Sequence, residues 1–144
     1  MLRIVCMILF SMLAVGCKTA PVDMAQQASS FSSPVVSLKD SSWNVLSVAS
    51  RGLMDLPKLT LSFKEAEVSG FSGCNQFRGR YTVVDSRLEV GELLTTRKLC
   101  SKVIMFQEYL LLNELKKTLF LSRTDNRVIL LTNNNGEVTT LSMQ

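Results

Sequence analysis

A short segment, FSGCNQFRGRYTVV at residues 71–84, places one cysteine and one asparagine among glycines. A thiol in such a segment can serve as a nucleophile, as part of a redox pair or as half of a disulfide. The chain contains no histidine, and this excludes the Ser-His-Asp and Cys-His nucleophile systems and the common zinc sites. Cys74 and Cys100 also lack the C-x-x-C spacing of a redox centre. An unusual Ser-Lys or carboxylate site stays open, but no motif indicates one. We therefore expect a protein that is not an enzyme and that uses no metal or cofactor.

The first 16 residues have the pattern of an export signal. The segment MLRIVCMILFSMLAVGC carries Arg3 as its only charge, followed by an apolar run and small residues before Cys17. The run of about twelve apolar residues is shorter than the roughly 20 that a transmembrane helix needs, so we expect residues 1–16 to be a cleaved signal peptide. The end of the segment resembles a bacterial lipobox, although Ala14 stands where Leu is usual. That resemblance implies that Cys17 becomes the lipid-carrying first residue; ordinary secretion, with Cys17 incidental, is the alternative.

Residues 17–40 join this expected lipid anchor to the rest of the chain. They are rich in Ser, Ala, Gln and Pro, a composition typical of a flexible tether. In lipoproteins of this kind an Asp after the cysteine favours the inner membrane, whereas here Lys18 follows Cys17. The resemblance thus implies an anchor in the outer membrane, on its periplasmic face. More than one acyl chain anchors a protein stably, so the expected partner is the membrane, through Cys17.

Residues 41–144 are long enough for one domain with its own core. Without Arg3, the chain has 16 − 1 = 15 Lys and Arg against 12 Asp and Glu, a net charge of +3. These charges are interspersed and form no basic stripe, so we expect no nucleic-acid partner.

Most of this domain has the alternation of β-strands. Leu59, Leu61 and Phe63, for example, share one face with a period of two. Asp85-Ser86 predicts a tight hairpin, and Asn135-Gly136 suits a type I′ turn. The predicted strands cover residues 42–49, 58–63, 80–84, 87–91, 119–124, 127–132 and 137–143.

One segment predicts a helix, at about residues 102–119. It has no Gly or Pro and places Ile104, Leu111, Leu115 and Leu119 on one face, while Phe106 on another side suggests further cover. The order of strands, one helix, then strands predicts a single α+β domain. Its mostly antiparallel β-sheet, curled and barrel-like, packs with one main α-helix.

Three spaced motifs in this domain resemble the META domain of HslJ-type lipoproteins and heat-shock proteins. They are SGCNQFRGRY, then the TTRKLC that ends at Cys100, then the helical FQEYLLLNEL, with Trp43 near the domain start. The residues that match the family pattern are Gly73, Cys74, Asn75, Gly79, Tyr81, Thr96, Arg97, Cys100 and Glu108. The resemblance implies the fold above and links to heat shock, envelope stress and novobiocin resistance, but no defining reaction.

Cys74 and Cys100 are the cysteines that remain once Cys6 is removed and Cys17 is acylated. An even pair in an oxidising periplasm usually closes, so we expect a disulfide; two free buried thiols are the alternative. Such a bridge over 26 residues stabilises by roughly 3–4 kcal/mol in the loop-closure description.

The other matching residues are expected to be structural. Asn75 suits a left-handed backbone in a turn, with a ligand contact as the alternative, and the glycines relieve crowding where the chain bends. Thr96 and Arg97 are expected to form a polar patch beside Asn75 that supports the fold through hydrogen bonds. Glu108 falls inside the apolar stripe and needs a partner. A structural ion pair with Arg97 or Arg80 is expected, and a catalytic acid is the alternative.

These expectations converge on a non-catalytic, lipid-anchored envelope protein that acts in envelope integrity, stress or antibiotic tolerance. Besides a cryptic hydrolase, which would need a cleft containing a pair of groups with shifted pKa values, two alternatives without catalysis remain open. One is a periplasmic binding or inhibitor lipoprotein that acts on an enzyme, which predicts an exposed loop or apolar patch. The other is an accessory subunit of an outer-membrane assembly complex.

Overall fold

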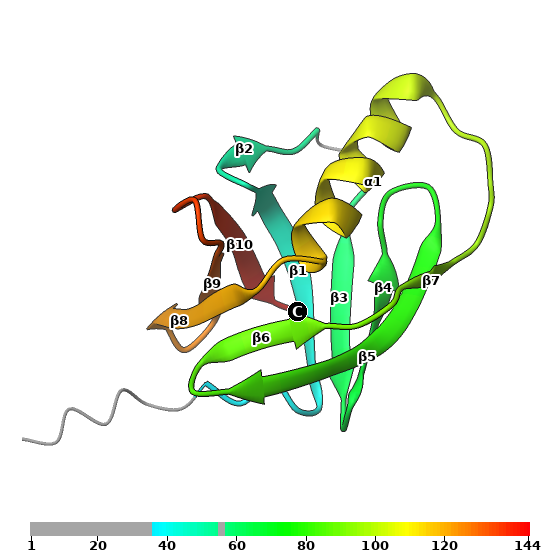
Figure 1. Cartoon of the computed structure of the whole chain (residues 1–144). Helices are drawn as coiled ribbons and strands as arrows, with labels where there is room; N and C mark the ends of the chain where they lie inside the picture. Colours follow the sequence, from blue (N-terminus) through cyan, green and yellow to red (C-terminus); the bar gives the residue numbers. More distant parts are fainter. Residues whose placement is uncertain (1–35, 55–56) are drawn as a thin grey trace, which may run out of the picture. The chain divides into compact units, whose positions relative to one another are not determined.

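The computed structural model describes residues 36–54 and 57–144, so the expected signal peptide and Cys17 lie outside the described residues. Within the described ranges the chain forms one helix, α1 (Lys102–Leu115), and ten strands (Figure 1). The strands are β1 (Ser41–Val48), β2 (Arg51–Gly52), β3 (Thr60–Lys64), β4 (Glu67–Phe71), β5 (Gln76–Val84), β6 (Arg87–Val90), β7 (Leu94–Thr95), β8 (Leu119–Asp125), β9 (Val128–Thr132) and β10 (Val138–Met143). None of the helical structure described is long and apolar enough to cross a membrane.

The strands form one antiparallel sheet that closes on itself. Its order is β10-β9-β8-β6-β5-β4-β3-β1, and β10 pairs again with β1 to close the ring. The short strands β2 and β7 lie off the ring, on β1 and β5. The expected α+β domain with a curled, barrel-like sheet and one main helix is therefore confirmed for the described residues.

Alternating side chains fill the interior of this barrel. Trp43 on β1, Phe63 on β3 and Leu131 on β9 are fully buried, while their chain neighbours face outward. Burial of each large apolar side chain stabilises the fold by roughly 1.5–3 kcal/mol. Val36 and Leu38, which precede the first strand, also pack into this core.

The two predicted hairpins close in different ways. Asp85 and Ser86 have φ angles of 49° and 61°, as the two central residues of a type I′ turn require. At the other hairpin the type I′ prediction is wrong, because Gly136 has a positive φ angle and Asn135 does not. There the side-chain oxygen of Asn133 accepts hydrogen bonds from the N–H groups of Asn135 and Glu137. The Asn133 side chain therefore organises a loop that is longer than the two-residue turn predicted here.

Helix α1 ends earlier than the sequence pattern predicts. It stops at Leu115, and the N–H of Lys117 bonds to the carbonyl of Glu114 to close the last turn. Leu119 was expected both to end the helix and to begin the strand at residues 119–124; the strand prediction is the correct one, because Leu119 opens β8 and pairs with Leu88 on β6. The apolar side chain of Leu119 satisfies both patterns, and pairing with the sheet decides which one forms.

The helix lies across one end of the barrel (Figure 1). Leu111 and Leu115 point inward and are fully buried, which closes that end of the core. Further cover was expected over Phe106, but none is present among the described residues, because Phe106 is 54% exposed. The outward side of α1 thus exposes large apolar side chains that no other described element covers.

Strand β4 was not predicted, because its glycine-containing sequence resembles a turn. Gly70 pairs with Leu61 on β3 and with Phe77 on β5. A Cβ atom at Gly70 would lie 1.9 Å from the backbone oxygen of Thr60. Glycine at this position therefore permits the close approach of β3 and β4.

We expect Gly70→Ala to lower the melting temperature by roughly 10 °C or to prevent folding, because backbone atoms must move to admit the methyl group. Gly52→Ala is the matched control, since a Cβ atom there has no neighbour within 4 Å, and its stability should change by less than about 0.5 kcal/mol. Thermal unfolding followed by circular dichroism measures both. Equal melting temperatures for the two variants would contradict this packing.

Candidate functional site

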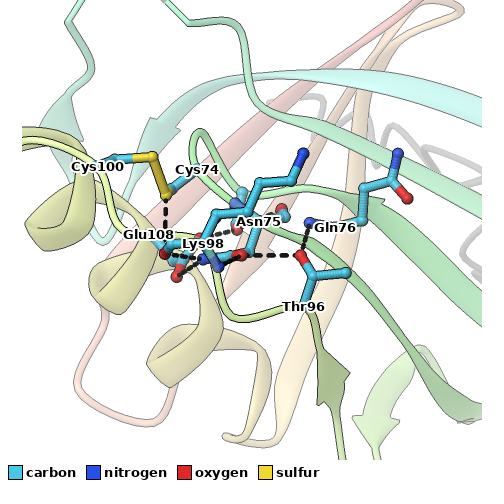
Figure 2. Close-up of a disulfide and its surroundings, with 8 residues drawn as sticks. Cys74, Asn75, Gln76, Thr96, Lys98, Cys100 and Glu108 are labelled. Atoms are coloured by element: carbon cyan, nitrogen blue, oxygen red, sulfur yellow. Dashed lines mark hydrogen bonds between the residues drawn. A yellow bond between two sulfur atoms is a disulfide. The ribbon is translucent and has the colours of Figure 1, made fainter.

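Four of the motif residues, Cys74, Asn75, Cys100 and Glu108, meet where the β4–β5 turn approaches the start of α1, with Thr96 beside Asn75 (Figure 2). Cys74 in that turn forms a disulfide with Cys100, just before the helix, and their Cα atoms are 6.0 Å apart. The expected bridge is therefore present. Gly73 has a φ angle of +105°, which an L side chain rarely adopts, so glycine allows the turn to present Cys74.

Asn75 lies beside the disulfide and is almost fully buried. Its side-chain oxygen accepts hydrogen bonds from the Thr96 hydroxyl (2.8 Å) and the Lys98 N–H (2.7 Å). Its side-chain nitrogen donates to Glu108 Oε1 (2.9 Å) and to the Lys98 carbonyl (3.3 Å). An amide can make four such bonds, and Asn75 makes all four. The side chain thus joins the turn, the 96–98 segment and the helix.

The predicted role of Asn75 in backbone conformation is wrong, because Asn75 has no positive φ angle. Its hydrogen-bonding side chain explains why asparagine stands here. Aspartate has the same shape but no N–H groups to donate, so it could not satisfy both Glu108 and the Lys98 carbonyl.

Glu108 receives its hydrogen bonds from the β4–β5 turn. Its Oε2 atom accepts from the Asn75 N–H (2.8 Å) and from the Ser72 hydroxyl (2.5 Å), while Oε1 accepts from the Asn75 side chain. The predicted ion pair with Arg97 or Arg80 is wrong, because the structure pairs neither arginine with Glu108. Backbone and side-chain donors satisfy this carboxylate instead.

Thr96 supports the fold through hydrogen bonds, as expected, while Arg97 does not contact Asn75 or its partners through hydrogen bonds. The Thr96 hydroxyl donates to Asn75 and also accepts from the Gln76 N–H at 3.2 Å. Arg97 is exposed, and no hydrogen bond links it to the other motif residues described. We name the group of Ser72, Asn75, Thr96, Lys98 and Glu108 the Asn75 cluster.

Gly79 and Tyr81 lie further along β5, away from the Asn75 cluster. A Cβ atom at Gly79 would approach the Glu92 carbonyl oxygen to 2.8 Å, so glycine relieves crowding there as expected. Tyr81 points into the barrel, and its ring packs edge-on against Phe63 with centroids 5.0 Å apart. Burial, with a smaller contribution from the negative charge of Asp40, raises the pKa of Tyr81 above its ordinary value.

The sequence analysis missed a second polar cluster at the other end of α1. Buried Glu114 accepts a hydrogen bond from the Asn133 side chain (2.6 Å) and pairs with Lys117 (2.6 Å). Asn133 also donates to Glu137 (2.8 Å). A Glu-Lys pair three residues apart was a visible signal, but the partner Asn133 lies in a distant hairpin.

Hydrogen bonding and charge shift two pKa values in this second cluster. The hydrogen bond to Glu114 raises the pKa of Lys117. The hydrogen bond from Asn133 is the main cause that lowers the pKa of Glu137, and the charge of Lys117 acts in the same direction. Both shifts favour the charged forms of Lys117 and Glu137.

An open groove of about 670 Å³ lies next to the Asn75 cluster. Gln76 and Thr96 belong to its lining and also exchange hydrogen bonds with each other. Strand β7 forms one side through Leu94 and Thr95, which pair with β5. Glu67 and Arg78 place one charge of each sign on the groove surface.

The Asn75 cluster is built for support, since its polar groups bond mainly to one another. In the described residues, no group of three or more Cys, Asp or Glu side chains is placed to hold a metal ion. The groove and the outward side of α1 are two surfaces of the described residues that are open to contact with other molecules.

Comparison with known proteins identifies the family to which this domain belongs. A META domain is matched over residues 36–144. The chain belongs to the META domain family. It is similar to an NMR structure of a protein from Burkholderia xenovorans, with a TM-score of 0.62 and 26% identity over 74% of this chain and 83% of that one. A second NMR structure shares the fold at a TM-score of 0.61 and 21% identity, over 75% of this chain and 95% of the other. None of the curated protein sequences matches the chain.

We expect Asn75→Ala to destabilise this META domain by roughly 2–4 kcal/mol, because it leaves Glu108 and the 96–98 segment without buried partners. Arg97→Ala is the matched control from the same motif, and its free energy of unfolding should change by less than about 0.5 kcal/mol. Urea unfolding measures both. If Asn75→Ala keeps its stability but loses stress tolerance in cells, the residue serves a ligand and the structural role is wrong.

Proposed function

We propose that this META domain protein is a non-catalytic lipoprotein of the bacterial cell envelope. Cys17 carries the lipid, the anchor lies in the outer membrane facing the periplasm, and the domain supports envelope integrity under heat or antibiotic stress. The observation that carries the proposal is the disulfide between Cys74 and Cys100. Disulfides persist in oxidising compartments such as the periplasm, which agrees with the export signal at residues 1–16.

The Asn75 cluster supports a non-catalytic role. A catalytic acid or base must lie within hydrogen-bond reach of the proton that it transfers. Both oxygens of Glu108 instead accept hydrogen bonds from the β4–β5 turn. The most distinctive polar groups of the motif therefore serve the domain's own structure.

A binding lipoprotein is the second candidate, and the groove beside the Asn75 cluster favours it. Arg78 and Glu67 on the groove surface form no ion pair among the described residues. Both charges are thus available to a partner with hydrogen-bonding groups. In this role the same anchored domain would hold or inhibit another envelope protein.

The intact mass of protein extracted from membranes tests the anchor and the bridge together. We expect a chain that begins at Cys17 and carries three acyl chains. After reduction the mass should increase by one hydrogen at each sulfur of Cys74 and Cys100. A mass that retains residues 1–16, or that lacks lipid, would contradict the lipoprotein assignment.

Cys17→Ser provides the matched control and the functional readout for the same experiment. The variant should lack lipid and leave the outer-membrane fraction, while its disulfide is unchanged. In a strain without the gene, the wild-type chain should restore growth in heat or novobiocin and Cys17→Ser should not. Full rescue by Cys17→Ser would show that the anchor is dispensable for the function.

A further inference from the structure

The outward side of α1 and the loop before it carry a group of exposed apolar side chains. Leu99 is 90% exposed, Tyr109 60% and Phe106 54%. We name this surface the outer helix face; its members are Leu99, Val103, Met105, Phe106 and Tyr109. Exposed apolar groups of this kind mark contact sites for proteins or membranes.

Helix geometry places this face opposite the core. With 3.6 residues per turn, Phe106 and Tyr109 lie on the side away from Leu111 and Leu115, which are fully buried. An ordinary surface helix has polar residues on its outward side. Here the outward side carries large apolar residues beside the exposed Lys102, Asn113 and Lys116, and Figure 1 shows no other labelled element over the outward side of α1.

The exposed charged residues on α1 and in residues 96–101 before it are all positive. Lys98 and Lys102 flank Leu99 and Val103 along the chain, and both lysines are exposed, as are Arg97 and Lys116. The acidic residues of the helix face elsewhere: Glu108 bonds to the β4–β5 turn and Glu114 is buried. The exposed surface is thus apolar and cationic.

We propose that the outer helix face docks onto a bilayer that contains anionic lipid. Phe106 and Tyr109 enter the boundary between headgroups and acyl chains, while Lys98 and Lys102 contact headgroup phosphates. Aromatic and aliphatic residues with flanking lysines are the composition that favours the membrane interface. The lack of exposed acidic groups on this helix favours an anionic surface over a partner of mixed charge.

This inference rests on the proposed function only in that lipidated Cys17 would keep a bilayer close. The 18 residues 18–35 separate Cys17 from the first described residue, Val36. A flexible coil of that length has a root-mean-square reach of about 25 Å. Such a short link gives the domain a high local concentration at the membrane, so that even a weak contact is enough to keep the outer helix face on the bilayer.

Vesicle flotation tests the docking without the anchor. The protein is the mature chain, residues 17–144, exported with an ordinary cleavable signal peptide and carrying Cys17→Ser so that no lipid is attached. We expect it to float with vesicles of phosphatidylglycerol and phosphatidylethanolamine, and much less with phosphatidylcholine vesicles. Added salt should weaken the association, because it screens the lysine charges.

Variants on the outer helix face should separate the apolar from the electrostatic contribution to membrane binding. Phe106→Ser and Tyr109→Ser should each lower the partition coefficient about fivefold through lost apolar burial. Lys98→Gln and Lys102→Gln should each lower the partition coefficient about fivefold at low salt, through the lost attraction to anionic headgroups. Two variants elsewhere on the surface are matched controls and should bind as the unsubstituted chain does. One is Val84→Ser, at an apolar residue that is 64% exposed beside the β5–β6 turn, and the other is Lys64→Gln in the β3–β4 hairpin. Unchanged melting temperatures confirm that each variant is folded.

Any one of the following outcomes would overturn the proposal. Absence of flotation, or flotation equal for all variants, excludes docking through this face. A Phe106-dependent dimer in sedimentation without lipid assigns the face to a second copy. A photo-crosslinker at position 106 that captures a protein in cells, instead of lipid, assigns it to a protein partner. Because this chain lacks the anchor, the result does not depend on whether Cys17 is lipidated.

Discussion

The structure depends on how α1 is held over one end of the barrel, because two of its glutamates need partners there. Glu108 is bonded to Asn75 in the β4–β5 turn, and Glu114 to Asn133 in the β9–β10 loop. Each pair joins a helix carboxylate to an asparagine amide from a distant hairpin. An unpaired buried carboxylate or amide is costly, so the two pairs fix the position of the helix while Leu111 and Leu115 close the core.

The disulfide extends this arrangement to the segment that precedes the helix. Cys100 is tied to the same turn that contains Asn75, and Thr96 and Lys98 bond to the Asn75 side chain. The chain from β7 to α1 is therefore fixed at several points although it has little regular structure. Exposed residues of this segment, such as Leu99, are in this way presented on a rigid support.

Much of the fold could be predicted from the sequence, because period-two alternation and turn residues report local structure. The strand with Leu61 and Phe63 and the Asp85-Ser86 turn are examples. Local signals failed where long-range pairing decided the outcome: Gly70 resembled a turn residue, and Leu119 fitted helix and strand equally. The disulfide followed from counting cysteines in a chain that was expected to be exported. The asparagine partners of Glu108 and Glu114 could not be predicted, because each lies in a hairpin far from the helix in sequence. Asn75 and Ser72 satisfied Glu108 where an arginine was expected.

The central claim is that the Asn75 and Glu108 side chains stabilise the domain as a coupled pair. A double-mutant cycle with Asn75→Ala, Glu108→Ala and the double variant, each measured by urea unfolding with the disulfide intact, tests it most directly. The structure predicts a coupling free energy of roughly 1–3 kcal/mol, so that the second substitution costs much less once the first is present. Additive effects of the two substitutions, within about 0.5 kcal/mol, would contradict the claim that this contact holds the helix on the barrel.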